Sequence, residues 1–359
     1  MVSITDKPDI MSMSKSELRT YLTESFDLPK YRADQIFDWL CRGASFEDMT
    51  NIPKALREKL ASEVFCSLPT IEAKFVSKVD GTVKYLFRLY DGNLIESVVM
   101  HYAHGNSICI SSEVGCNMGC RFCASTIGGM TRKLLPGEML GQVARADFDG
   151  ADISNIVMMG IGEPLDNYDN VIKFLKLVTS DDGINIGARH ISLSTCGLAD
   201  KIYELAKEEL GITLSISLHA CDDETRSSIM PVNNKWNIEK LLRACRDYFI
   251  TTGRRISFEY TLIAGKNDSV AQAQKLADLF HRHFTLNQKL LPIHVNLIPV
   301  NEVKERDFET SSKEAVKKFA DTLNKRKINA TIRRKLGPDI NASCGQLRRS
   351  YEQKTQVQA

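Results

Sequence analysis

From residue 107 to residue 298 the sequence alternates between short strand-like runs and helical segments. Such alternation predicts a parallel sheet with helices outside it, an α/β fold whose chemistry lies at the carboxyl ends of the strands. Six units are fewer than the eight of a closed barrel, so we expect an open, partial (β/α)6 barrel. The expected strands are Ser107–Val114, Asn155–Gly160, His190–Ser194, Thr213–Ser217, Ser257–Ile263 and His294–Ile298, and the expected helices are Gly137–Phe148, Asn170–Thr179, Ala199–Glu208, Ile238–Ile250 and Val270–His281.

Two smaller parts precede the barrel. Residues 1–70 have a helical period after Ser14, after Tyr31 and after Pro53, which predicts a small N-terminal helical domain. Residues 71–104 switch to a period of two, and Asp-Gly turns separate the runs, which predicts a short antiparallel connector. The barrel and a catalytic C-terminal segment are then expected over residues 105–345, followed by a tail at 346–359. The connector strands are expected at Ile71–Lys78, Val83–Tyr90 and Leu94–Tyr102.

Composition excludes several classes of protein. Lys and Arg number 47 against 45 Asp and Glu, so the net charge of +2 excludes a wholly basic nucleic-acid coat but not a local basic surface. The sequence has neither a transmembrane-length apolar run nor the apolar core of a secretory signal, so we expect a cytoplasmic location and no membrane partner. In that compartment ten cysteines indicate metal ligands, catalysts or buried thiols more than disulfides.

The most specific motif is Cys116-x3-Cys120-x2-Cys123, just after the first expected barrel strand. Three thiolates on one loop can converge on a metal centre. A structural zinc site normally takes four ligands, and the next cysteine downstream is Cys196. The motif therefore favours a 4Fe–4S cluster with one open iron. Zinc with a distant fourth ligand and a chance group of three buried thiols remain alternatives.

This motif, with Phe122 before its last cysteine, resembles that of the radical S-adenosylmethionine (SAM) enzymes. The resemblance implies a radical SAM barrel and one 4Fe–4S cluster whose open iron chelates SAM. Reduction of the cluster then cleaves SAM and produces a radical. In such enzymes the cofactor carries the radical chemistry, and the protein orients it and excludes water and oxygen.

Polar and glycine residues follow the other expected strands, where they would surround SAM. Gly162 lets the backbone approach a ligand, and Glu163 can accept hydrogen bonds from an ammonium group. Singly, the strand-end serines are as well explained as ordinary polar residues, and His219 as a core histidine. Together, at successive strand ends, they are candidate SAM-binding residues. The full candidate set is Gly162, Glu163, Ser194, Ser217, Leu218, His219 and Asn301.

Two cysteines outside the motif are further candidates. Cys344 lies in a stretch, residues 326–349, with seven Lys or Arg and one acid. Such cations favour the thiolate and attract phosphates, although an incidental cysteine in a solvated charged tail has the same pattern. Cys109 lies on the first barrel strand, where it can face the lumen or be an inert buried thiol.

Several motifs together resemble one family, the RlmN dual-specificity RNA methyltransferases, over nearly the whole chain. The resemblance includes the helical front, where Tyr31-Arg-Ala-Asp-Gln-Ile matches the family pattern. Asn341 and Ser343 depart from the Asp and Ala that are common before the modified cysteine. The other matching segments are Cys109-Ile-Ser-Ser-x-Val-Gly-Cys116, Cys123-Ala-Ser-Thr-x-Gly-Gly, Met-Gly-Ile-Gly-Glu163-Pro-Leu, Ser217-Leu-His-Ala, Val-Asn-Leu-Ile-Pro-Val-Asn301 and Cys344-Gly-Gln-Leu.

The resemblance implies roles for three catalytic residues. Cys344 is methylated by one SAM and then carries the methyl group to C2 of adenine through a transient crosslink, while a second SAM is consumed at the cluster. Glu96 matches a carboxylate proposed to accept the C2 proton, although it can equally be an acid on a strand face. Cys109 matches the cysteine that closes a disulfide with Cys344 to release the product.

The resemblance also implies partners. The family substrates are an adenosine of 23S ribosomal RNA, modified before full ribosome assembly, and the adenosine beside the anticodon in some tRNAs. Radical chemistry also requires an electron donor such as flavodoxin.

Three competing functions remain open. A Cfr-type enzyme would methylate C8 instead; Pro164 favours the RlmN assignment because Cfr-like sequences tend to carry Ala there. A non-enzymatic iron–sulfur or zinc RNA-binding module would not need Cys344. A radical SAM enzyme acting on a small molecule or peptide would leave the basic C-terminal segment unexplained.

Overall fold

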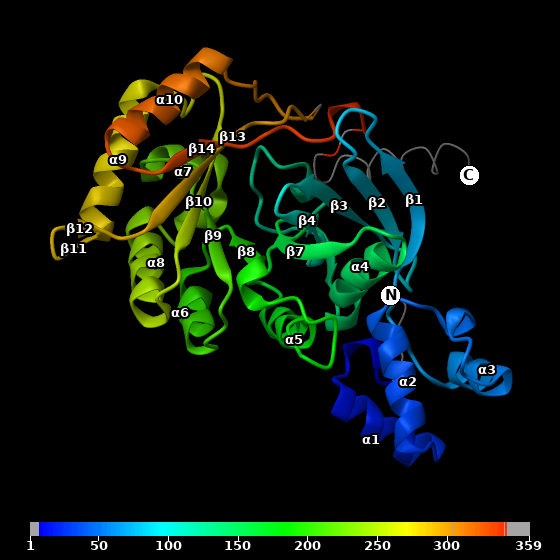
Figure 1. Ribbon diagram of the computed structural model, residues 1–359. Helices are drawn as coiled ribbons and strands as arrows, with labels where there is room; N and C mark the ends of the chain where they lie inside the picture. Colours follow the sequence, from blue (N-terminus) through cyan, green and yellow to red (C-terminus); the bar gives the residue numbers. More distant parts are fainter. Residues whose placement is uncertain (1–6, 304, 341, 343–359) are drawn as a thin grey trace.

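One mixed sheet organises the protein (Figure 1), whose structure, a computed structural model, describes residues 7–303, 305–340 and 342. In the described part the strand order is β1-β2-β3-β4-β7-β8-β9-β10-β13-β14, and its two ends do not pair with each other. The strands are β1 (Thr70–Val76), β2 (Val83–Arg88), β3 (Leu94–Tyr102), β4 (Gly105–Cys109), β7 (Ile153–Met158), β8 (Ile191–Thr195), β9 (Thr213–Ser217), β10 (Ile256–Leu262), β13 (Ile293–Pro299) and β14 (Ala330–Ile332).

Within this sheet the neighbouring strands β4, β7, β8, β9, β10, β13 and β14 are all parallel. They include all six expected barrel strands, so the predicted open α/β barrel is confirmed. The additional strand, β14, pairs with β13 over Val295↔Ala330 to Leu297↔Ile332. At three residues, β14 is too short to produce a recognisable sequence period.

The first barrel strand differs from the expectation. The run Ser107–Val114 does not form one strand: β4 ends at Cys109, and the chain leaves the sheet where Ser112 N–H donates to the Ile161 carbonyl at 2.8 Å. Residues beyond that point form a separate hairpin of β5 (Glu113–Gly115) and β6 (Met130–Lys133), which frames the cysteine loop. A second small hairpin pairs β11 (Thr285–Leu286) with β12 (Lys289–Leu290).

The expected helices are present, and Figure 1 shows α4, α5, α6, α8 and α9 on the outer side of the sheet. Ser14 caps α1 with Glu17 in a capping box, as its position suggested. The sequence analysis missed α7 and α10. The helices are α1 (Lys15–Phe26), α2 (Lys30–Cys41), α3 (Lys54–Glu63), α4 (Pro136–Phe148), α5 (Tyr168–Val178), α6 (Ala199–Lys207), α7 (Asp223–Ile229), α8 (Ile238–Thr252), α9 (Val270–Phe284) and α10 (Lys313–Lys325).

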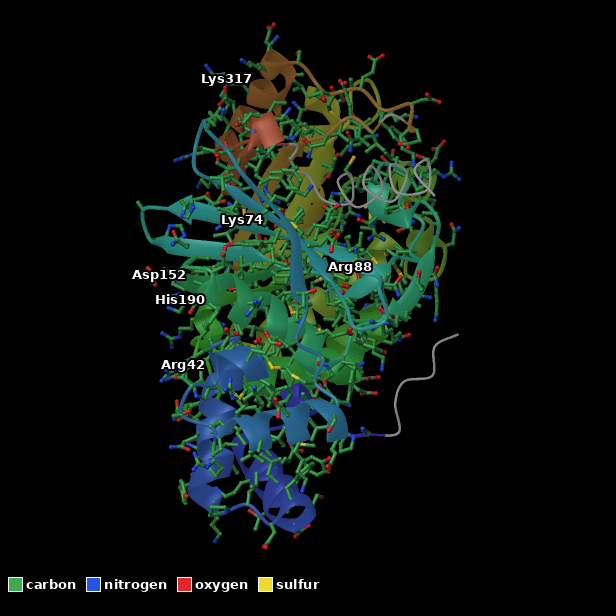
Figure 2. All side chains as sticks on the ribbon, turned by 90° about the vertical axis from the view of Figure 1, so that its right-hand side faces the viewer. Arg42, Lys74, Arg88, Asp152, His190 and Lys317 are labelled. Carbon is green, nitrogen blue, oxygen red and sulfur yellow. The ribbon has the colours of Figure 1, made fainter. Side chains whose placement is uncertain are left out.

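The antiparallel strands β1, β2 and β3 extend the barrel sheet. As expected they pair with one another, and β3 also pairs with β4 from Val98↔Cys109 to Tyr102↔Gly105. Figure 2 turns this edge toward the viewer, with Lys74 and Arg88 on it above the N-terminal helices that carry Arg42. The predicted connector is therefore part of the wall that surrounds the barrel interior.

The N-terminal helices pack on α4 and share the hydrophobic core of the barrel. The buried carboxylate of Asp9 accepts hydrogen bonds from Ser12 and Ser67, and Ser12 Oγ accepts one from Gly137 N–H at 2.8 Å. Gly137 is required there, because a Cβ would lie 2.3 Å from Ser67 Oγ. The four-part division of the chain stays a prediction, and its 346–359 tail lies outside the described residues. None of the described helices is long and apolar enough to span a bilayer.

Candidate functional site

A cavity of about 590 Å³ lies at the carboxyl ends of the parallel strands. Five of these parallel strands, β7, β8, β9, β10 and β13, contribute residues to its wall, as the α/β arrangement predicts. Ten of the candidate site residues line it. They are Cys109, Cys116, Cys120, Cys123, Gly162, Glu163, Ser194, Ser217 and His219, joined by Asn301 in the segment after β13.

The cysteine loop between β5 and β6 is held by its own backbone. Cys116 N–H donates to the Gly129 carbonyl at 3.2 Å, and Thr126 Oγ1 bonds the carbonyls of Cys120 and Cys123, each at 3.0 Å. Gly115 has φ +85°, and a Cβ there would lie 2.0 Å from the Gly129 oxygen. The loop thus turns all three thiols toward the cavity without a disulfide among them.

The three thiols suit a cluster more than a single ion. Burial raises the pKa of the Cys120 thiol to about 12 and also raises that of Cys116, and binding a metal favours the thiolate form of such ligands. Among the described residues no three His, Cys, Asp or Glu side chains converge as a single metal ion requires. A cubane spreads its thiolates over separate iron corners and does not require that convergence.

Glu163 is fully buried and ties two strand ends together. Its Oε2 accepts from Cys196 N–H at 2.7 Å, and its Oε1 accepts from Leu165 N–H at 3.0 Å. Burial raises the pKa of Glu163, and these amide hydrogen bonds counteract it. Its own N–H donates to Glu113 Oε2 at 2.9 Å. The carboxylate therefore lines the cavity in a fixed orientation and keeps lone pairs available to a ligand.

His219 ends β9 in a left-handed conformation, with φ +57°. Its Nδ1 accepts a hydrogen bond from Thr261 N–H at 2.9 Å, so the neutral ring carries its proton on Nε2. Burial lowers the pKa of His219 to about 3, which keeps the ring neutral. Its ring packs edge to face against the ring of Phe122 in the cysteine loop, and the two ring centroids are 5.0 Å apart. His219 thus joins the β9 end to the cysteine loop.

Two candidates do not lie on the cavity wall. Leu218 has a fully buried side chain in the apolar core, so only its backbone lies near the strand end. Glu96, on β3, forms a buried ion pair with Lys84 at 3.0 Å. Its neighbour Val98 lines the cavity, and Val98 pairs with Cys109 across β3 and β4.

Cys109 is 5% exposed and packs in a small apolar cluster with Val98, Met100, Met159, Leu336 and Ala342. Cys344, Asn341 and Ser343 lie outside the described residues. Arg333, Arg334 and Lys335, from the basic stretch, line the cavity. The structure therefore brings Cys109 and part of the basic stretch to the same cavity as the three-cysteine loop.

Sequence reasoning missed Arg226, on α7. Its side chain is fully buried and donates five hydrogen bonds, all to neutral acceptors: Asn233 and the carbonyls of Leu218, Trp236, Cys196 and Ser217. It therefore ties the ends of β8 and β9 together below the cavity. Arginine is almost never fully buried, so nothing in the sequence around it indicated this role.

Glu259 and Thr261, on β10, also line the cavity and were missed. Glu259 is buried, and its Oε2 accepts from Asn296 Nδ2 at 2.7 Å. Burial raises its pKa, while Arg333 and the hydrogen bond from Asn296 counteract the shift. The signal was available: an acid inside a predicted buried strand is unusual unless it faces a polar lumen.

Comparisons with known proteins agree with this geometry. Residues 110–277 match the family model of the radical SAM superfamily, and residues 8–66 match that of the ribosomal RNA large subunit methyltransferase N-terminal domain. A protein of Clostridium novyi named probable dual-specificity RNA methyltransferase RlmN is 51% identical over 96% of this chain and 98% of its own. A protein of Lachnoclostridium phytofermentans with the same name is 50% identical over 100% of this chain and 99% of its own.

A solved structure is similar over the same extent. The crystal structure of a radical SAM methyltransferase from Sphaerobacter thermophilus superposes with a TM-score of 0.87 and is 42% identical, covering 94% of this chain and 98% of that one. The family expected from the motifs is therefore confirmed. The chain matches both the radical SAM model and the methyltransferase N-terminal model, and relatives named RlmN are about 50% identical to it along its whole length. This protein therefore belongs to the RlmN family of radical SAM enzymes.

Proposed function

We propose that this chain is an RNA methyltransferase that places a methyl group on C2 of one adenosine in 23S ribosomal RNA and of the adenosine beside the anticodon in tRNA. The observation that carries the proposal is that the three-cysteine loop, the candidate SAM-binding residues at the strand ends and Cys109 all line one cavity. Full-length similarity to proteins named probable dual-specificity RNA methyltransferase RlmN supports RNA as the methyl acceptor.

Membership of the radical SAM superfamily implies a 4Fe–4S cluster and SAM. Cys116, Cys120 and Cys123 would hold the cluster, and Gly162, Glu163, Ser194, Ser217, His219 and Asn301 would surround SAM. When bound, the two supply one-electron chemistry that breaks an otherwise inert C–H bond. A radical route is needed because C2 of adenine is electron-poor and does not attack the methyl group of SAM.

The two remaining cysteines divide the work. Cys344 would accept a methyl group on sulfur by nucleophilic displacement from one SAM and carry it to the base, while a second SAM is consumed for each methyl transferred. Cys109, on the cavity wall, would then form a disulfide with Cys344 as the product leaves. Glu96, whose carboxylate forms a buried ion pair with Lys84 on the neighbouring strand, would take the C2 proton.

RNA recognition follows from the charge at the cavity. Arg333, Arg334 and Lys335 line it and can bind phosphates on either side of an extruded adenosine. We place the reaction in the cytoplasm, on 23S RNA before full ribosome assembly and on tRNA, with flavodoxin or a similar protein as electron donor.

Product analysis tests the proposal. The enzyme is reconstituted without oxygen and given SAM, a reductant and unmodified ribosomal RNA or tRNA, and the digested nucleosides are compared with standards by mass spectrometry. We expect 2-methyladenosine from the wild type and none from Cys116→Ala, which also loses the absorbance of its cluster. The control Cys41→Ala, a thiol on α2 in the N-terminal helices, should match the wild type.

Other products would point elsewhere. 8-Methyladenosine would place the protein with the Cfr-type enzymes and refute the C2 assignment. SAM cleavage without any methyladenosine would refute an RNA adenine substrate. Full activity in Cys344→Ala would refute the methylcysteine route while leaving the product assignment intact.

A further inference from the structure

The sheet beside the cavity contains a buried lysine. Lys84, on β2, has its Nζ 3.0 Å from Oε2 of Glu96 on β3, and both side chains are almost completely buried. Lysine is almost never fully buried unless it is paired. A buried ion pair is also often no more stable than well-packed apolar residues of similar size, so stability alone does not explain why the pair is there.

Strand alternation places both charges on the cavity side of the sheet. On β3, Ser97 bonds a side chain of α4, so its neighbours Glu96 and Val98 face the opposite side, and Val98 lines the cavity. On β2, Tyr85 bonds the residue that caps the C-terminus of α4, so Lys84 also faces the cavity side. The ion pair therefore lies on the inner face of the sheet, away from the outer helix.

The strand register puts the pair beside Cys109. Lys84 pairs with Val98 across β2 and β3, and Val98 pairs with Cys109 across β3 and β4. Glu96 lies one row nearer the carboxyl ends of the parallel strands, where Ser111 Oγ donates to its carbonyl at 2.8 Å. Glu96 borders a narrow gap together with Val98 and Cys109, which also line the cavity. The Glu96 carboxylate therefore lies directly behind the cavity wall.

Lys84 can do two things for this carboxylate. Its long side chain reaches Glu96 diagonally across two strands, and a charge-assisted hydrogen bond fixes the direction in which the carboxylate points. The ammonium also compensates a negative charge that burial would otherwise penalise. A general base must aim its oxygen at the proton that it takes, so orientation limits how well Glu96 can act.

We propose that Lys84 is a positioning residue for Glu96, whose carboxylate it holds in the orientation that accepts the C2 proton. The inference rests on the role of Glu96 in the proposed function and adds a second residue to it. In that step the C2–H bond breaks, its proton passes to a carboxylate oxygen of Glu96, and its electron pair stays with the base. No covalent bond of Lys84 forms or breaks.

An isotope effect at C2 separates orientation from general damage to the fold. RNA with protium or deuterium at C2 of the target adenosine is methylated anaerobically in single turnovers, and SAM cleavage is measured beside 2-methyladenosine. We expect Lys84→Met to form 2-methyladenosine roughly 30-fold more slowly, which is less than the roughly 100-fold or more that a whole general base contributes. The protium-to-deuterium rate ratio should rise above the wild-type value, because proton removal becomes the slow step, while SAM is cleaved at the wild-type rate. Lys84→Arg keeps the charge and should recover most of the rate.

A double variant shows whether Lys84 acts through Glu96. Lys84→Met leaves a buried carboxylate unpaired, whereas Lys84→Met with Glu96→Gln removes both charges, so the double variant should unfold at a higher urea concentration than Lys84→Met alone. It should also form 2-methyladenosine no more slowly than Glu96→Gln does. The control Lys74→Met, which breaks a more exposed ion pair with Asp149 at the edge of the same sheet, should match the wild type in rate and isotope ratio.

Three outcomes would overturn the inference. They are a Lys84→Met rate equal to that of Lys74→Met, a slower rate with an unchanged isotope ratio, and a double variant slower than Glu96→Gln. In each of them a wild type that makes 2-methyladenosine leaves the proposed function standing. A wild type that cleaves SAM but makes no 2-methyladenosine would instead refute the proposed function, and the role of Lys84 would fall with it.

Discussion

The cavity has two walls that are built differently. The ends of β7, β8, β9 and β10 are tied by buried polar side chains: Glu163, Arg226 and Asn267 each bond backbone groups of neighbouring segments. The opposite wall, formed by the paired strands β3 and β4 and by residues 333–340 and 342, has a small apolar cluster. Three hydrogen bonds also join Gly337 and Asp339 to the β1–β2 turn at the protein surface. One wall is tied by interior hydrogen bonds to buried polar side chains, whereas the chain that completes the other is held in part by contacts at the surface.

Buried and surface hydrogen bonds differ in how firmly they fix the groups that they join. Buried hydrogen bonds to charged groups are strong, and removing one partner leaves other buried groups unsatisfied. Asp339 lies at the surface, where a hydrogen bond can break and re-form with water at little cost. A wall that orients a bound cofactor benefits from the first kind of contact.

The largest test breaks the rigid wall. Arg226→Met removes the donor for four backbone carbonyls, and each buried acceptor left unsatisfied costs about 1–3 kcal/mol. We expect the free energy of unfolding to fall by at least about 4 kcal/mol in urea denaturation. Arg243→Met, on the exposed side of α8, is the matched control and should change little. A loss below about 1 kcal/mol would mean that Arg226 does not hold this wall together.

A middle-sized test uses pH. His219 has a pKa near 3 when folded and an ordinary value of 6.5, so between these values the unfolded chain binds the extra proton. Its contribution to stability is complete above pH 6.5 and is lost as pH falls. From pH 7 to pH 5 it should remove about 2 kcal/mol. His219→Asn, which tolerates the left-handed backbone, should lack this part of the pH dependence.

Denaturation at both pH values measures the His219 effect. The exposed His190, labelled in Figure 2, provides the control: His190→Asn should keep the wild-type difference between pH 7 and pH 5. An unchanged difference in His219→Asn would show that the ring does not stay neutral in the folded protein.

The smallest expected effect is on the wall formed by β3, β4 and the chain after β14. Asp80→Ala removes the acceptor for Gly337 N–H and should change the free energy of unfolding by no more than about 0.5 kcal/mol, as is usual for surface substitutions. The same urea denaturation measures it beside Arg226→Met. A loss comparable with that of Arg226→Met would erase the distinction between the two walls.

The strands of the barrel could be predicted because each has its own local period and sits between recognisable helices. β14 and α7 could not, since three and seven residues are too few to establish a period. The cysteine loop was found from spacing alone. Leu218 was chosen with its motif, and the structure buries its side chain in the core, because alternate residues of a strand face opposite sides.

The contacts that were missed are long-range ones. Arg226 lies in α7, which the sequence analysis did not predict, and its partners Cys196 and Ser217 lie at the ends of two different strands. Asp80 likewise accepts a hydrogen bond from Gly337, a residue more than 250 positions later. No local pattern encodes such a pair, so only the fold could reveal it.

The described chain after β14 also links the two edges of the open sheet. It starts from β14, one edge strand, and is hydrogen-bonded to the turn beside β1, the other edge strand. The two edges are joined in this way without forming a ladder. The join consists of three hydrogen bonds and the packing of Leu336 and Ala342 against the apolar cluster of Cys109. Side-chain contacts and turn amides thus do at this point what strand pairing does in the rest of the cavity wall.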